Sequence, residues 1–230
     1  MSKRFFTDAW IRPATGNEAA DMIRLAGELG YSAVAVEGNE EVFKTASKTA
    51  TDSGLEVFRR RTIMVSTKNR LYEELAKHRW SYELISVKSN EREVVMAALR
   101  DMRVDTVIMS HSSAPLIDRH IVSVASNFVE VVLSDLIEHG YEAFYRVLRL
   151  STYLKKDRIK MIMTSGASDC LGVRAPMQLP SILLAMGVGP DRALKTVSGP
   201  IIELLRQNRA KLTGLLEPTG VWRIEDLARR

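Results

Sequence analysis

Three carboxylates and one imidazole near the ends of predicted strands are the residues best suited to chemistry. Asp8 and Glu37 follow the first two predicted strands, His111 follows the fifth, and Glu130 lies within the sixth. In a parallel α/β barrel the carboxyl ends of the strands meet at one face, so these side chains could form a cluster. Carboxylates and imidazoles bind Mn²⁺ or Zn²⁺, which activate water for hydrolysis. One hypothesis is therefore a metal-dependent phosphoesterase.

A second interpretation of the same residues involves no metal. Barrel phosphohydrolases usually present several histidines, whereas this chain has four in total, and His78 and His139 fall on or beside predicted helices. The carboxylates would then be hydrogen-bonded groups that line the mouth of a barrel, together with Arg12. His111 would be a partly exposed loop residue.

Small residues also follow the last clear strand, in the run Thr164-Ser165-Gly166-Ala167-Ser168-Asp169. Such a turn leaves backbone N–H groups free to bind a phosphate or a ribose oxygen. Any short strand-to-helix turn favours the same residues, and Ser165 has no evident base to activate it. The chain has no Walker sequence and no G-x-G-x-x-G dinucleotide motif.

Cationic residues exceed anionic ones, 33 against 28, which gives a net charge of +5 and a pI near 9.4. This balance permits binding to a polyanion without requiring it. The cations recur in three groups: Arg59, Arg60, Arg61, Lys68 and Arg70; Arg146, Arg149, Lys155, Lys156, Arg158 and Lys160; and Arg174 with Lys195. In a strand, Arg59 to Arg61 alternate between faces, so at most two of them share a surface. The second group is better placed for an RNA backbone to follow.

The elements that must position these residues alternate between two-residue and 3.6-residue apolar periods. Strands are predicted at residues 5–11, 32–36, 57–65, 83–87, 106–109, 128–133 and 160–164. Helices are predicted to begin near Asn17 and to cover 40–51, 68–77, 116–125, 141–155, 177–186, 191–197 and 201–207, with another capped by Asn90. The apolar spacing places Met102, Phe144 and Leu148 on buried helix faces.

About seven strand–helix units without a hairpin signal predict parallel strands, which close most naturally into a TIM-like (β/α) barrel. An open doubly wound sheet is the alternative. We expect one domain over residues 1–230, with a polar C-terminal tail over about 213–230.

Several classes of protein are excluded by composition. The single cysteine, Cys170, cannot form an internal disulfide, and no Cys/His cluster has zinc spacing. No apolar run approaches the ~18 residues that cross a bilayer, and the start of the chain, MSKRFF, lacks the apolar core of a signal peptide. We therefore expect a cytoplasmic location.

The order of motifs in the last third of the chain resembles a known family. A strand with a central acid, 127-NFVEVVLSDLI-137, leads through the helix 144-FYRVLRL-150 to a strand that ends in Ser165-Gly166-Ala167. Arg174-x-Pro176 and 193-ALKTVS-198 follow. This order resembles the archaeal ribonuclease P protein component 3 family, and the first half agrees more loosely, through 7-TDAWIRP-13. The resemblance covers roughly residues 4–210.

The resemblance implies a barrel related to the polymerase and histidinol phosphatase hydrolases but without their metal-binding histidines. Where those hydrolases carry His-x-His, this chain has Asp8 and Trp10. The implied function is that of a ribonuclease P subunit, which binds the catalytic RNA and supports removal of the 5′ leader from precursor tRNA. The RNA performs the Mg²⁺-dependent hydrolysis, so no catalytic residue, metal ligand or bound cofactor is expected in the protein.

The resemblance also implies contacts and partners. Arg174 and Lys195 match the basic positions of the family best, followed by Lys156, Arg158 and Lys160, and Ser165 and Gly166 complete the expected RNA-binding set. The expected partners are the ribonuclease P RNA, a Pop5-type protein subunit in a heterotetramer, other ribonuclease P proteins and, indirectly, precursor tRNA. No membrane contact is expected.

Overall fold

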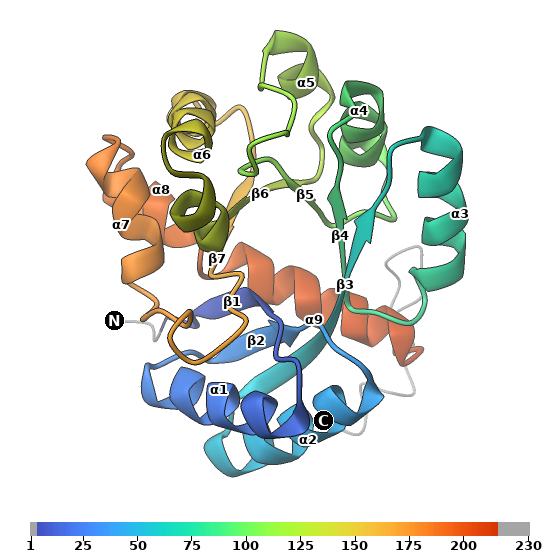
Figure 1. The fold of residues 1–230 in the computed structure, drawn as a ribbon, viewed down its shortest axis with the longest axis vertical. Helices are drawn as coiled ribbons and strands as arrows, with labels where there is room; N and C mark the ends of the chain where they lie inside the picture. The colour runs from blue at the N-terminus through green and yellow to red at the C-terminus, as the bar shows by residue number, and fades with distance from the viewer. Residues whose placement is uncertain (1–3, 216–230) are drawn as a thin grey trace.

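The computed structural model describes residues 4–215, and its centre is a sheet of seven parallel strands in chain order (Figure 1). The strands are β1 (Thr7–Ile11), β2 (Ala33–Val36), β3 (Glu56–Met64), β4 (Leu84–Lys88), β5 (Thr106–Ile108), β6 (Phe128–Val132) and β7 (Met161–Thr164). Each neighbouring pair is parallel, in keeping with the helical crossovers between the strands. Every strand matches a predicted one within a few residues.

The first and last strands meet and close the sheet into a barrel. Ile11 forms a parallel bridge with Ala167, just beyond β7. The N–H of Gly166 donates to the carbonyl of Trp10 at 3.1 Å, and the N–H of Arg12 donates to the carbonyl of Ala167 at 2.8 Å. The predicted barrel is thus confirmed, and the open sheet is wrong.

Helices surround the strands on the outside of the barrel (Figure 1). They are α1 (Gly16–Glu28), α2 (Glu40–Ser53), α3 (Lys68–His78), α4 (Arg92–Arg100), α5 (Arg119–Val124), α6 (Leu133–Leu154), α7 (Gln178–Ala185), α8 (Pro190–Lys195) and α9 (Pro200–Leu212). Within residues 4–215, no helix is long and apolar enough to cross a membrane.

Helix α9 differs from the others because it covers the amino-terminal end of the barrel. Its Ile201, Ile202 and Leu205 pack in one buried cluster with Phe58 of β3 and Leu84 of β4. The side-chain amide of α9 residue Asn208 donates to the carbonyl of Glu83 and to the carboxylate of Asp105. The end of the barrel opposite to the expected site is therefore sealed.

Two predicted helix starts are corrected by local hydrogen bonding. Helix α1 is capped by Thr15 rather than Asn17, because Thr15 and Glu18 form a reciprocal capping box. Helix α4 begins after Glu91, without a side-chain cap, so Asn90 lies outside it.

Three residues predicted on buried faces are exposed instead. Met102 is 92% exposed because α4 ends at Arg100. Gly140, at φ 49° and ψ −121°, breaks α6. After the break the buried face is formed by Ala143, Val147, Leu150 and Leu154, which leaves Phe144 and Leu148 outside. The predicted tail from residue 213 lies almost entirely outside the described residues.

Candidate functional site

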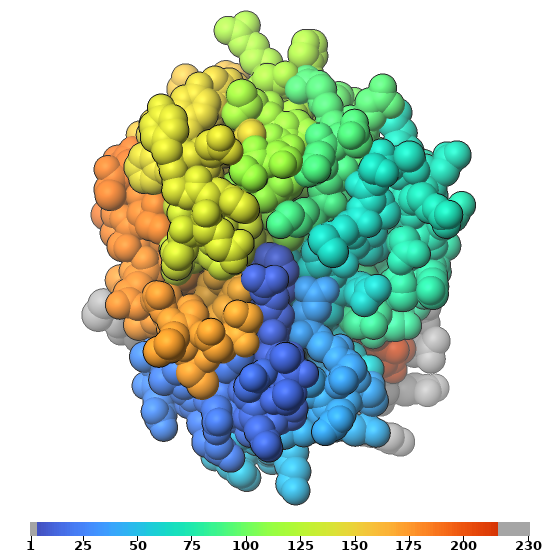
Figure 2. All heavy atoms as spheres, in the orientation of Figure 1, coloured from blue at the N-terminus to red at the C-terminus, as the bar shows by residue number. Residues whose placement is uncertain are grey.

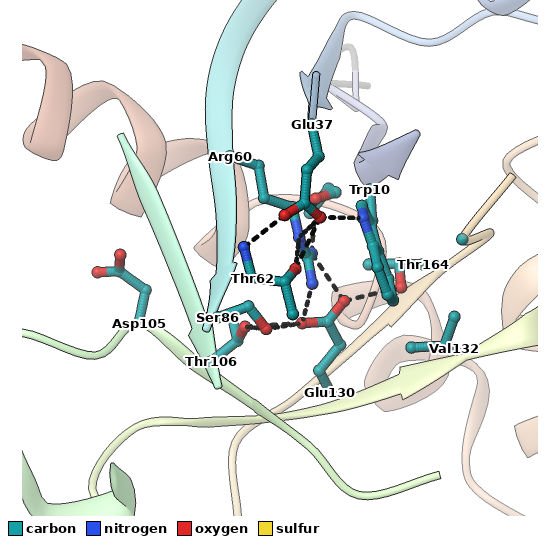
Figure 3. Close-up of polar contacts among 12 residues, drawn as sticks. Trp10, Glu37, Arg60, Thr62, Ser86, Asp105, Thr106, Glu130, Val132 and Thr164 are labelled. Carbon is teal, nitrogen blue, oxygen red and sulfur yellow. Dashed lines mark hydrogen bonds and ion pairs between the residues drawn. The ribbon is translucent and has the colours of Figure 1, made fainter. Parts of the chain in front are cut away.

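Arg60 and Glu130 form an ion pair in the centre of the barrel, and both side chains are fully buried (Figure 3). The guanidinium donates from Nη1 to Oε1 at 2.7 Å and from Nη2 to Oε2 at 3.0 Å. Three hydroxyls from β4, β5 and β7 also donate to the same carboxylate, namely those of Ser86, Thr106 and Thr164. Because its lone pairs are occupied by these five donors, Glu130 is not free to bind a metal.

Glu37 is engaged in a similar way, one layer nearer the mouth of the barrel (Figure 3). The carboxylate of Glu37 accepts a hydrogen bond from the indole Nε1 of Trp10 at 2.8 Å. It also accepts from the backbone N–H of Thr62 at 2.6 Å and from the Thr62 hydroxyl at 2.8 Å. The guanidinium of Arg60 lies 4.2 Å from the centre of the Trp10 ring, and that of Arg12 lies 5.4 Å from it. Trp10 and its two cationic neighbours thus fill the carboxyl end of the barrel.

Asp8 lies within β1 rather than after it, and it is buried beside the seam between β1 and β7. Its Oδ1 accepts from the N–H groups of Trp10 at 3.2 Å and Ser165 at 3.1 Å, whereas Oδ2 has no hydrogen-bond partner. Burial raises the pKa of Asp8 to about 6, although these donors oppose the shift. The carboxyl is therefore a buried structural group that is partly protonated under mildly acidic conditions.

His111 is 3% exposed, so the expectation of a partly exposed loop residue is wrong. Its Nε2 has no hydrogen-bond partner. Burial lowers the pKa of His111 to about 4, and the cations Lys88 and Arg146 lower it further. The imidazole is consequently neutral at pH 7.

The four residues do not assemble into a metal centre. Within residues 4–215, no group of three or more His, Cys, Asp or Glu side chains is arranged to hold a metal ion. The interpretation of hydrogen-bonded carboxylates lining the barrel is confirmed, and the geometry does not favour the metal-dependent phosphoesterase.

The small residues after β7 also differ from expectation, because their N–H groups are not free to bind a ligand. The N–H of Ser165 donates to Asp8, that of Gly166 to the carbonyl of Trp10, and that of Ala167 to the hydroxyl of Ser165. Ser165 is 2% exposed and Gly166 is buried. The expectation that Ser165 and Gly166 offer N–H groups to a phosphate is therefore wrong; they close the barrel instead.

The remaining predicted cations lie outside the barrel. Lys156 and Arg158 are exposed on the loop between α6 and β7, and Lys160 and Lys195 are exposed beside it. Lys160 and Lys195 line one groove of about 360 Å³, together with Arg192. We call the six cations gathered here the α6–α8 basic cluster; they are Lys155, Lys156, Arg158, Lys160, Arg192 and Lys195.

Arg174 lies on a different segment, the loop between β7 and α7. Its Nη1 donates to the carbonyls of Leu171 and Val173, and its own carbonyl accepts from the hydroxyl of Tyr31 at 2.8 Å. The side chain is half-buried. The structure therefore brings Lys160 and Lys195 together at one groove and anchors Arg174 on a separate loop.

Arg60 is the site residue that sequence reasoning misassigned, because it was grouped with surface cations. The guanidinium of Arg59 stacks on the Phe43 ring and forms an ion pair with Glu40. Arg61 is exposed. Of the three consecutive arginines, only Arg60 therefore points into the barrel. Because side chains alternate between the two faces of a strand, Arg60 must point away from the face that carries Arg59 and Arg61. Glu130, the acid inside β6, is the partner of Arg60 from across the barrel rather than from a neighbouring strand, so the pairing depends on closure of the sheet.

Fold and site together define a (β/α) barrel whose interior charges are neutralised by one another. The model of the family described as RNase P subunit p30 matches residues 5–213. The chain belongs to this family.

Similar proteins agree with this assignment. The chain is 23% identical over 222 residues to ribonuclease P protein component 3 of Methanococcoides burtonii, covering 91% of this chain and 90% of that protein. It is 25% identical over 222 residues to the same component of Methanosarcina barkeri, covering 91% and 92%.

One solved structure shares the fold. A chain in a cryo-EM structure of archaeal ribonuclease P with mature tRNA superposes with a TM-score of 0.77 at 18% identity, covering 95% of this chain and 97% of that chain. This likeness confirms the barrel architecture.

Proposed function

We propose that this protein is a noncatalytic subunit of ribonuclease P, which binds the catalytic RNA and supports removal of the 5′ leader from precursor tRNA. The family match over residues 5–213 carries the proposal. The barrel interior is consistent with it, because Arg60 and the strand hydroxyls occupy the carboxylates that a phosphoesterase would need. The holoenzyme is an endoribonuclease, and its RNA supplies the Mg²⁺-dependent chemistry.

The α6–α8 basic cluster and Arg174 are the proposed RNA contacts. Lys160 and Lys195 line one groove together with Arg192 and the acid Asp157, and Lys156 and Arg158 are exposed on the adjoining loop between α6 and β7. Cations at such a surface neutralise phosphates and release counterions, which stabilises a compact RNA and reduces its need for Mg²⁺. Arg174 would act from its separate loop.

The assembly is proposed to contain further components. These are a Pop5-type protein, joined with this chain in a heterotetramer, the other ribonuclease P proteins, and precursor tRNA, which is contacted indirectly. The chain would act as one domain over residues 1–230, in the cytoplasm, without a bound cofactor of its own.

The test is an omission assay. Ribonuclease P is reconstituted from its RNA and other proteins, and precursor-tRNA cleavage is timed with and without this chain at limiting Mg²⁺. We expect cleavage to depend on the chain, and the isolated chain to hydrolyse neither precursor tRNA nor simple phosphoesters. Equal cleavage after omission would overturn the proposal.

A second arm tests the contacts. Lys195→Ala and Arg174→Ala should each raise the Mg²⁺ concentration that gives half-maximal cleavage, whereas Lys48→Ala, an exposed lysine on α2, should not. Identical Mg²⁺ curves for all three variants would remove these residues from the RNA interface and leave the subunit assignment intact.

A further inference from the structure

The groove beside the α6–α8 basic cluster lies at the amino-terminal ends of β6 and β7. Phe128 and Met161 are the first residues of these strands, and both line the groove. The opposite end of the barrel faces the viewer in Figure 2, where the segments after β1 (dark blue) and β7 (orange) lie side by side. The groove is therefore separate from the mouth of the barrel. Its volume of about 360 Å³ is at the lower end of the range for ligand pockets, which suits one small group.

The floor of this groove is apolar. It is formed by Phe128, Leu154, Ile159, Met161 and Pro200. Leu154, Ile159 and Met161 are each at most 5% exposed and belong to the main core, so they are fixed in place. Phe128 is half-buried and packs against the apolar cluster under α9. A rigid floor of this kind favours contact with a flat, weakly polar ring.

The rim of the same groove is charged. Three cations and one acid line it: Lys160, Arg192, Lys195 and Asp157. The Nε of Arg192 lies 3.5 Å from Oδ1 of Asp157, and the Nζ of Lys160 donates to the carbonyl of Ser126 at 3.3 Å. Lys195 is exposed and pairs with no acid among residues 4–215. The charge of Lys195 is therefore available to an anion that lies over the apolar floor.

We propose that the groove binds one unpaired nucleotide of an RNA strand, with its base on the apolar floor and an adjoining phosphate at Lys195. The inference rests on the proposed ribonuclease P function, because it names the kind of RNA that this surface contacts. Apolar side chains beside cations are the combination that binds single strands, since the bases contact the former and the phosphates the latter. A base within a duplex cannot reach the floor unless it leaves the stack.

The test compares two fluorescein-labelled hexamers by fluorescence anisotropy with the full chain. One is a single-stranded RNA without self-complementary sequence, and the other has the same number of phosphates but abasic sugars. We expect the RNA hexamer to bind at least about tenfold more tightly, the effect of one base held on a protein surface. Equal affinities would mean that the groove contacts phosphates alone, and they would overturn the proposal.

Two matched variants locate the base. Phe128→Leu removes the ring from the floor and should lower the ratio of the two affinities at least about threefold. Phe43→Leu alters another half-buried phenylalanine, on α2 and outside the groove, and should leave the ratio unchanged. Lys195→Ala should weaken both hexamers by a similar factor, because both carry the phosphate. If Phe128→Leu folds as the unaltered chain does and keeps the full ratio, the base lies elsewhere and the proposal is wrong.

A free nucleotide has the same base and phosphate, so 5′-AMP is the final probe. We expect it to bind at least about 100-fold more weakly than the RNA hexamer, because only a strand places further phosphates on the rest of the basic cluster. Equal affinity would assign the groove to a free nucleotide and overturn the RNA assignment. The omission assay is independent of these results: cleavage that depends on the chain, combined with equal binding of the two hexamers, would remove this inference and keep the subunit assignment.

Discussion

At the scale of single residues, the barrel depends on a buried charge pair that is fully hydrogen-bonded. Removing Arg60 and Glu130 from water is costly, and their attraction offsets the cost only because the remaining lone pairs are satisfied. The hydroxyls of Ser86, Thr106 and Thr164 supply those bonds from three strands. The pair therefore joins strands across the barrel in the place where a catalytic cluster would need free carboxylates.

The first prediction concerns this pair. Arg60→Met leaves Glu130 as an uncompensated buried charge and should lower the free energy of unfolding by about 3–5 kcal/mol, measured by urea denaturation. Arg61→Met, the exposed neighbour on the same strand, should change it by less than about 0.5 kcal/mol. Adding Glu130→Gln to Arg60→Met should recover part of the loss because no net buried charge remains. Similar losses in the two single arginine variants would contradict the role of Arg60.

The second prediction follows from Asp8, whose pKa lies at about 6 in the folded protein against an ordinary 3.8. Between these values the folded state binds more protons than the unfolded state, so stability falls as the pH rises from about 4 to about 6. The difference amounts to roughly 3 kcal/mol, at about 1.4 kcal/mol per pKa unit. Asp8→Asn should abolish this component while keeping an oxygen that accepts from Trp10 and Ser165.

The measurement is the unfolding free energy of both proteins at several pH values. Burial also raises the pKa of Asp105 and Asp135, so the informative quantity is the difference between the native protein and Asp8→Asn. That difference should shift in favour of Asp8→Asn as the pH rises. Parallel pH profiles would show that the Asp8 carboxyl titrates normally.

At the scale of elements, closure of the barrel depends on the turn after β7. Gly166 has φ +64°, and a Cβ there would lie 2.4 Å from Cγ1 of Val132 and 2.5 Å from Oγ of Ser134. Its N–H also forms one of the bonds to β1. The glycine is needed so that the backbone of this turn can approach β6 and β1 together.

The third prediction compares two glycines with nearly equal φ angles. Gly54→Ala, at φ +65° with open space around it, should cost about 1 kcal/mol for the left-handed conformation alone. Gly166→Ala should cost at least about 2 kcal/mol more, because the clash forces β6 and the seam apart. Thermal unfolding measures both, and amide hydrogen exchange should rise at Arg12 only in Gly166→Ala. Equal losses would mean that the close approach at Gly166 is unimportant.

Most helices and strands were predictable from the sequence, because the spacing of buried apolar residues within each element depends only on neighbouring residues. The β3 strand and the α2 helix with its Gly54 cap follow from a few neighbouring residues. The positions of His111, Arg60 and Ser165 were not predictable in this way, because each is set by groups from distant strands. The face of α6 was misjudged because apolar side chains lie on both of its sides: Val147 and Leu150 are buried, whereas Phe144 and Leu148 are 45% and 40% exposed.

At the scale of the whole molecule, acids are paired or hydrogen-bonded inside the barrel, whereas a cluster of cations lies on its outer surface. Inside the barrel, Glu130 is neutralised by Arg60 and Glu37 is hydrogen-bonded to Trp10 and Thr62. Outside, the α6–α8 basic cluster places six cations on and beside one groove. Together with the net charge of +5, this cluster suits a partner that carries a continuous line of phosphates.

The last prediction is the salt dependence that this distribution produces. If Lys195 contacts one phosphate, Lys195→Ala should reduce the slope of log K against log salt concentration by about 0.7–0.9, since each contact releases condensed counterions. Lys48→Ala removes the same charge from a surface on α2 and should leave the slope unchanged, although both variants have the same net charge. Filter binding of ribonuclease P RNA across a salt series measures the slopes. If the slope falls equally in both variants, RNA binding depends on the net charge of the protein, and the α6–α8 basic cluster is not a specific RNA contact.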